Sequence, residues 1–332
     1  MLPLVAPDDK DLRFISSILG AVVSISLEDV IALEELDAKT RAILPALYGE
    51  SYEDVQPVSM GSAALKYGPD GRVAWDEIWA TFCDLALAGG PPHRGTLLEP
   101  ASVSEIAANP EKHAEVVNEI VRGVSLVTGL PVRASAQPGW IEVQCDTIAM
   151  AEWLVRAIVI ENVLASHQAD ILFLPAGPEF RLVKEIKNVV TVSAKTCHYW
   201  LEHTPQDQQQ AIAAMFARMN SETPLLSPAS PAEVLAAPGD YRSTVDKLAA
   251  DLRPLGLPTF ANRYGGWLGI ECASVGQAVW LARGLIVDNV LARREGEVLF
   301  IPVHPVFATG GQCERLVSLF VRLYRLSLLK NG

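Results

Sequence analysis

Part of this chain occurs twice, and that repetition limits its fold more than any other feature of the sequence. Residues 130–176 align with residues 257–303 at a constant offset of 127, without a gap. Seventeen of the 47 aligned positions are identical, whereas unrelated segments share roughly 6% of their residues by chance. The sequence therefore predicts an internal duplication in which both segments have the same fold.

Apolar periodicity and turn residues divide each copy into elements in the order α-β-β-α-β-α. Gly129 is predicted to end the first helix as a C-cap, and Thr147 and Ser274 to cap the long apolar helices. The predicted elements of the first copy are 111–127, 131–136, 140–145, 147–164, 171–175 and 179–203. Those of the second copy are 258–263, 267–272, 274–291, 298–302 and 311–329, after a weaker leading helix that contains Pro254.

This order of elements predicts an α/β chain of the α+β type. Three strands are too few to bury both faces of a sheet. We therefore expect the copies to pack about a pseudo-twofold axis and share one core, with tandem domains that merely touch as the alternative. The predicted divisions are an N-terminal leader at 1–75, repeat unit 1 at 76–203, a connector at 204–240 and repeat unit 2 at 241–332.

The leader and the connector carry weaker patterns than the repeats. In the leader we predict a helix from Leu27 to Leu47 and a hairpin over 63–75, because Gly-Pro-Asp-Gly there favours a turn. A helix from Trp75 to Leu87 should then end at Gly89-Gly90. The connector is predicted to hold a helix at 206–219 and then a Pro/Ser-rich linker.

Composition excludes several classes of partner. The formal net charge of −12 repels phosphate backbones and anionic lipids, so we predict neither nucleic acid nor membrane as a partner. The longest apolar stretch, Ile15 to Leu27, falls short of the ~20 residues that span a bilayer. The N-terminus lacks a signal-peptide pattern, which predicts a cytoplasmic protein. The five cysteines form no CxxC pair, so they are predicted to be buried thiols, and no metal site is predicted.

Residues that both copies retain are needed twice, which favours a role in folding or in a symmetric interface. We interpret the tryptophans as core anchors. Arg156 and Arg283 suggest a buried ion pair or a clamp on carbonyl oxygens; the alternative is an anion site that uses Arg, a carboxylate and Asn. The retained pairs are Trp140/Trp267, Cys145/Cys272, Trp153/Trp280, Arg156/Arg283, Glu161/Asp288, Asn162/Asn289 and Pro175/Pro302.

Residues present in one copy only are the better candidates for function. The last helix of the first copy has a polar stripe at helical spacing, formed by Lys184, Lys187 or Asn188, Thr191, Lys195, His198 and Glu202. One interpretation is a solvated face. The other makes His198 an acid or base beside a lysine that holds an anion. His198 and Glu202 as two metal ligands are a weaker alternative.

The segment Gly89-Gly90-Pro91-Pro92-His93-Arg94-Gly95-Thr96 is the other candidate. Paired prolines stiffen the backbone, and the flanking glycines allow tight turns. Such a loop would present His93 and Arg94 at fixed geometry, with Arg94 suited to a carboxylate or phosphate. The alternative is a rigid connector whose His and Arg face solvent.

Together these features predict a cytosolic enzyme that acts by acid/base chemistry on a small organic anion in a pocket between the repeats. It would be a lyase or hydrolase without an organic cofactor. The predicted catalytic residues are His93, His198 and Lys184, and the predicted binding residues are Arg94, Lys195, Asn188, Arg156 and Arg283. The alternatives are a non-catalytic binding or assembly protein with a quasi-symmetric acidic surface, and a metal-handling protein. A homo-oligomer is compatible with the pattern.

Overall fold

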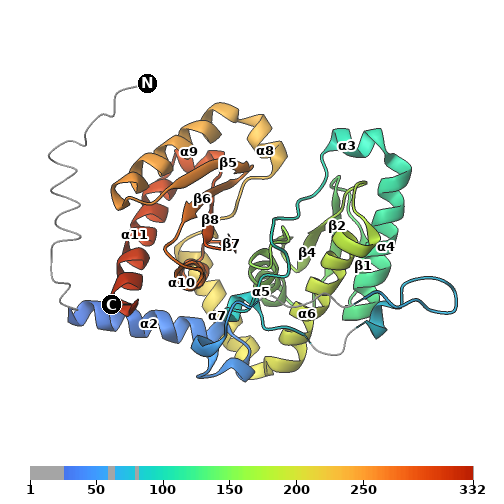
Figure 1. Cartoon of the computed structure of the whole chain (residues 1–332), viewed down its shortest axis with the longest axis horizontal. Coiled ribbons are helices and arrows are strands. Elements are labelled where there is room, and N and C mark those ends of the chain that lie inside the picture. The colour runs from blue at the N-terminus through green and yellow to red at the C-terminus, as the bar shows by residue number, and fades with distance from the viewer. Residues whose placement is uncertain (1–25, 59–63, 79–81, 332) are drawn as a thin grey trace.

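The computed structural model describes residues 26–58, 64–78 and 82–331. It contains two antiparallel four-stranded sheets flanked by helices (Figure 1). The first sheet has the order β1-β2-β4-β3 and the second β5-β6-β8-β7. The strands are β1 (Val132–Ala134), β2 (Trp140–Gln144), β3 (Ser166–Gln168), β4 (Ile171–Pro175), β5 (Thr259–Tyr264), β6 (Trp267–Glu271), β7 (Arg293–Glu295) and β8 (Val298–Pro302).

Each sheet has one strand more than the sequence predicted. β3 and β7 are short and polar, Ser-His-Gln and Arg-Arg-Glu, so they lack the apolar alternation from which strands are recognised. They form because each pairs with a long apolar strand, β4 or β8, through a tight turn. The prediction of three strands per unit was therefore incomplete.

The two sheets also share their strand register. Trp140 lies opposite Pro175 in the first sheet, and Trp267 lies opposite Pro302 in the second. Ser166 lies opposite Phe173, and Arg293 opposite Phe300. Residues 127 apart thus hold the same place in the two sheets, and we call such residues counterparts. We call residues 97–203 the first half and residues 225–331 the second half.

The long apolar helix of each half is α5 (Ile148–Val159) or α10 (Val275–Val287). The predicted caps are confirmed, because the hydroxyls of Thr147 and Ser274 accept backbone N–H bonds from Met150 and Gln277. Both helices end sooner than predicted. Asn162 and Asn289 have φ angles of 65° and 64°, a left-handed conformation in which Asn is tolerated and a helix cannot continue.

A pair of helices precedes each sheet: α3 (Val103–Ala108) and α4 (Pro110–Thr128) in the first half, and α8 (Pro231–Ala236) and α9 (Pro238–Leu252) in the second. Each pair begins with a capping box, Ser102 with Glu105 or Ser230 with Glu233. α8 occupies part of the segment that we predicted as a Pro/Ser-rich linker. Ser230 caps α8, and Pro231 and Pro238 are the first residues of α8 and α9. The predicted C-cap at Gly129 is confirmed, with φ of 71°.

The last helix of each half packs against the other helices of the same half. α6 (Lys187–His203) follows a π-helical turn at Leu182–Ile186 and packs against α4. α11 (Gln312–Asn331) packs against α9 and α10. Between the halves, α7 (Gln206–Glu222) packs against α5. None of the described helices is long and apolar enough to cross a membrane.

The leader differs in part from its prediction. α2 (Leu27–Ile43) is capped by Ser26, and a 3-10 turn at Ala46–Tyr48 follows it. The predicted hairpin is reduced to one bridge between Tyr67 and Val73, and 59–63 lie outside the described residues. The helix predicted from Trp75 to Leu87 was wrong. The described residues of this range form 3-10 turns at Trp75–Glu77 and Ala86–Ala88 and no helix at 78 or 82–85, and 79–81 lie outside the described residues. The stretch Ile15–Leu27 is described only from residue 26.

Candidate functional site

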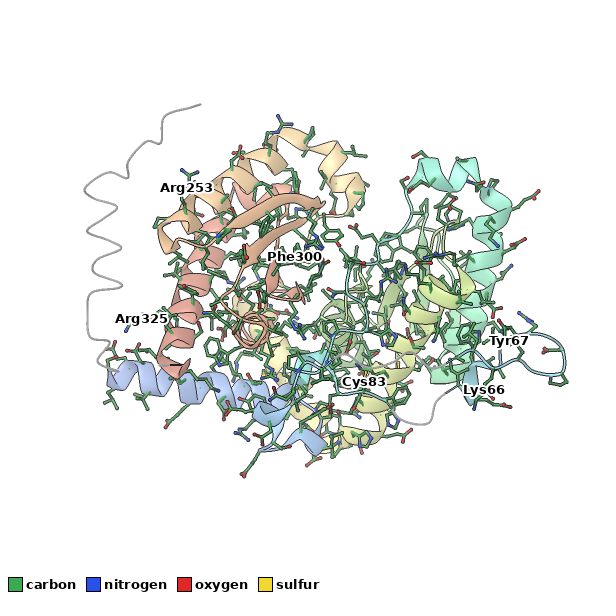
Figure 2. The ribbon with its side chains drawn as sticks, in the orientation of Figure 1. Lys66, Tyr67, Cys83, Arg253, Phe300 and Arg325 are labelled. Atoms are coloured by element: carbon green, nitrogen blue, oxygen red, sulfur yellow. The ribbon has the colours of Figure 1, made fainter. Side chains whose placement is uncertain are left out.

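A buried ion pair joins two residues of the first half. The Lys195 ammonium lies 2.8 Å from Glu161 Oε1, and the two side chains are 1% and 0% exposed. Lys195 Nζ also donates to the carbonyl oxygen of Asp84 at 3.0 Å and to Cys83 Sγ at 3.2 Å; Figure 2 labels Cys83. Burial alone would lower the pKa of Lys195, but the Glu161 carboxylate and Cys83 together outweigh burial and raise the pKa. The predicted solvated stripe was therefore wrong at Lys195.

Glu161 also fixes the segment that leads to the His93 loop. Its Oε1 accepts the backbone N–H of Ala86 at 2.9 Å, and its Oε2 accepts the backbone N–H of His93 at 2.7 Å. Three charge-assisted bonds thus converge on one carboxylate, which is how a buried charge is stabilised. The pair anchors this loop to the first half.

His93 itself points into the protein. Its Nε2 lies 2.5 Å from the Thr191 hydroxyl on α6, and Thr191 is buried. Burial and the neighbouring cations Lys195, Lys187 and Arg94 lower the pKa of His93 to about 3. The imidazole is therefore neutral at physiological pH and a weak base. The loop presents His93 to α6, so the alternative of a connector whose histidine faces solvent was wrong for this side chain.

The neighbouring Arg94 is held by backbone contacts. Its Nε donates to the carbonyl oxygen of Thr96 at 3.1 Å, and its own carbonyl oxygen accepts from Asn162 Nδ2 at 2.8 Å. The same Nδ2 donates to the carbonyl oxygen of Arg294 at 2.8 Å. Asn162 therefore joins the loop to strand β7 of the second half.

The two retained arginines, Arg156 and Arg283, are buried and bonded within the protein. Arg156 donates to the carbonyl oxygen of Glu152 at 2.8 Å and to Asn289 Oδ1 at 2.5 Å, and stacks over Phe216. Arg283 donates to three carbonyl oxygens, those of Tyr52, Leu87 and Ala88. Burial lowers the pKa of each arginine to about 10. Arg283 thus forms the carbonyl clamp that was one of our structural interpretations, and it also borders a pocket of about 370 Å³ beside α2.

The remaining predicted residues of α6 are not gathered around His93. His198 Nε2 lies 3.1 Å from His203 Nε2, and its Nδ1 lies 3.1 Å from Glu202 Oε1. The His198 ring also packs 5.0 Å from the Phe82 ring. Lys184 is exposed on the π-helical turn, and Asn188 is half-buried one turn later. Among the described residues, no group of His, Cys, Asp and Glu could hold a metal ion.

A pocket of about 580 Å³ is lined by residues of both halves. The first half contributes Trp140 of β2, Gln137 of the turn before it, and Ser166 and His167 of β3. The second half contributes Leu225, residues 227–230, Glu233, Leu291 and His304. This volume lies within the range of small-molecule sites.

His304 and Glu233 form the charged edge of this pocket. His304 Nδ1 accepts the backbone N–H of Val306 at 3.2 Å, and its Nε2 lies 3.3 Å from Glu233 Oε1. Burial would raise the pKa of Glu233, but hydrogen bonds from Ser230 and the nearby His304 lower it. Glu233 is therefore a carboxylate at neutral pH, and its side chain is 53% exposed.

We assigned no role to His167 and His304 from the sequence, although the sequence contains a signal for both. His167 has Arg294 as its counterpart, and residue 177, which lies 127 before His304, is glycine. Both histidines thus occur in one half only, which was our own criterion for a functional candidate.

Comparison with known proteins adds no functional information. No protein-family model matches the chain, and no curated protein matches it. Among solved structures, Sphingomonas wittichii serine palmitoyltransferase is similar over 52% of this chain and 43% of its own, at 13% identity and a TM-score of 0.22. The chain thus spans less than half of that protein, and a TM-score this low carries no argument.

Proposed function

We propose that this protein binds a small molecule, without catalysis, in the pocket between its two halves. The observation that carries the proposal is the 580 Å³ pocket itself, because residues of both halves line it. Ligand sites are typically concave, largely apolar and supplied with a few polar groups, and they occur preferentially at such boundaries. Trp140 and Leu164 supply apolar surface here, and Ser227, Glu233 and His304 supply polar groups.

Binding is favoured over acid/base catalysis because the side chains of His304, His93 and Lys195 already have protein partners. Both ring nitrogens of His304 are engaged, by Val306 and Glu233. The low pKa of His93 makes it a poor base, and Lys195 is tied to Glu161. A general base near neutral pH needs a free nitrogen and a pKa close to the working pH.

We also propose that the halves arose by duplication of one unit and became specialised afterwards. Equal strand order and equal register support this origin. Equivalent backbone bonds outside the strands support it as well. The N–H of Leu98 donates to the carbonyl oxygen of Asn162 at 2.9 Å, and that of Leu226 donates to the carbonyl oxygen of Asn289 at 3.0 Å. In this view the pocket arose in the first half, where a side-chain contact that the second half retains was lost.

The proposal is tested by thermal unfolding of the full chain with a broad panel of metabolites. A ligand at 100 times its Kd stabilises the folded protein by about 2.7 kcal/mol, which is a shift of several degrees. The variant Ser227→Trp fills the pocket and should lose every shift. The control Ser104→Trp places the same side chain at an exposed position on α3, outside the pocket lining, and should retain them. Ligand shifts that persist in Ser227→Trp would place the binding site elsewhere.

A further inference from the structure

The second half fills the place that corresponds to the pocket with its own arginine. Arg293 of β7 is 0% exposed, and its guanidinium lies over three aromatic rings: 4.0 Å from the ring centre of Phe300, 4.5 Å from that of Tyr264 and 5.0 Å from that of Trp267. Phe300 is labelled in Figure 2. Arg293 NH1 pairs with Glu295 at 2.7 Å. Its Nε and NH2 have no hydrogen-bond partner within the described residues, so the aromatic faces provide much of its stabilisation.

The first half keeps two of these aromatic rings but lacks the arginine. Trp140 is the counterpart of Trp267, and Phe173 is the counterpart of Phe300. Ser166 pairs with Phe173 in the first sheet, as Arg293 pairs with Phe300 in the second sheet. Gln137 replaces Tyr264 at the corresponding position. Loss of the long Arg and the Tyr ring leaves space, and Trp140, Ser166 and Gln137 all line the pocket.

The charges around the pocket select the kind of group that can occupy this space. Of the described residues that line it, none is Lys or Arg, and Glu233 is the one carboxylate. An anion would therefore have no fixed positive charge to pair with, contrary to our expectation of an anionic ligand. A planar cation could stack on Trp140 and pair with Glu233, as Arg293 stacks on Trp267 and pairs with Glu295.

Resting on the binding function proposed above, we infer that the ligand carries a planar cationic group of the guanidinium or amidinium type. This group takes the place in the first half that the Arg293 side chain takes in the second. Trp140 provides the ring on which this group stacks, and Glu233 provides the opposite charge. The short Ser166 side chain leaves space for the group.

The test uses three probes of the same shape and different charge: benzamidine, benzamide and benzoate, measured by calorimetric titration of the full chain. Benzamidine, a cation at neutral pH, should bind at least about tenfold more tightly than benzamide, since cation–π and charge pairing together exceed 1.4 kcal/mol. Benzoate should not bind. Equal affinity for benzamidine and benzamide, or tighter binding of benzoate, would overturn the inference.

Two variants place the site and separate this inference from the binding function. Glu233→Gln should weaken benzamidine about tenfold and leave benzamide unchanged. Glu105→Gln is its matched control, because Glu105 forms the same capping box on α3 and does not line the pocket. Ser166→Arg supplies the missing guanidinium from the chain itself and should abolish binding of benzamidine, whereas Ser104→Arg should not.

The possible outcomes are distinct. If ligands of another charge class bind and Ser166→Arg blocks them, the binding function stands and the cationic class is wrong. If Ser166→Arg blocks no ligand that the wild type binds, both proposals fail. Unchanged benzamidine affinity in Glu233→Gln would remove Glu233 as the counter-charge and overturn the inference.

Discussion

The buried pair of Lys195 and Glu161 gives the sharpest prediction for stability. Replacing Lys195 by Met keeps much of the side-chain length and removes the charge, so Glu161, which is 0% exposed, loses its counter-ion. The carboxylate retains two backbone donors, the N–H groups of Ala86 and His93. Removal of one partner from a buried pair costs about 3–5 kcal/mol, chiefly because the remaining charge stays buried and uncompensated.

The assay is equilibrium urea unfolding of the wild type, Lys195→Met, Glu161→Gln and the double variant. The double variant should be more stable than the sum of the single losses predicts, with a coupling of about 1–3 kcal/mol. Hydrogen exchange of the Ala86 and His93 amides should also accelerate in Glu161→Gln, because these amides lose a charged acceptor.

The chain offers a matched control for this experiment. Asp288 is the counterpart of Glu161 and pairs with Lys39 at 2.5 Å, but these side chains are 18% and 41% exposed. Lys39→Met should therefore cost less than about 1 kcal/mol, as solvent-exposed pairs do. If Lys195→Met is no more costly than Lys39→Met, or if the double variant shows no coupling, our account of the buried pair is refuted.

Three further predictions follow from single residues. The pKa of His93 is lowered to about 3, so between pH 6.5 and pH 3 the unfolded chain binds a proton at this residue that the folded chain does not bind. The free energy of unfolding should therefore fall as the pH drops from 6.5 towards 3, by up to about 1.4 kcal/mol per pH unit. Urea unfolding of a His93→Gln variant at each pH should lack this component of the pH dependence. Asn162→Ala removes two bonds to carbonyl oxygens and should cost about 2–4 kcal/mol in the same assay, a result that a cost near zero would contradict. Gly266→Ala should destabilise the protein by at least about 1 kcal/mol more than Gly256→Ala in thermal unfolding. Both glycines have φ near 70°, but an added Cβ would lie 2.4 Å from the Ala229 carbonyl oxygen only at Gly266. Equal costs of the two variants would show that this contact relaxes.

Local patterns predicted those elements whose own residues specify them. The strands Trp140–Gln144 and Ile171–Pro175 and the helix caps at Thr147 and Ser274 depend on apolar periodicity and on one hydroxyl. β3 and β7 were missed, because three polar residues form a strand only when a neighbouring strand supplies their hydrogen bonds. The 3-10 turns that replace the predicted helix after Trp75 likewise depend on packing of the leader against the rest of the protein.

The site shows the same division. The sequence by itself determined that two segments share a pattern, and it identified His93, Lys195, Arg156 and Arg283 as polar residues that needed explanation. Only the tertiary structure decided that Lys195 meets Glu161 and that Arg283 meets backbone carbonyl oxygens, because these contacts join residues far apart in the chain. The pocket is the clearest case. In the sequence, Ser166 and Arg293 look like an ordinary difference between the two halves. The equal register of the two sheets places each of them opposite a phenylalanine, so that the Arg293 side chain fills its half where Ser166 leaves the pocket open.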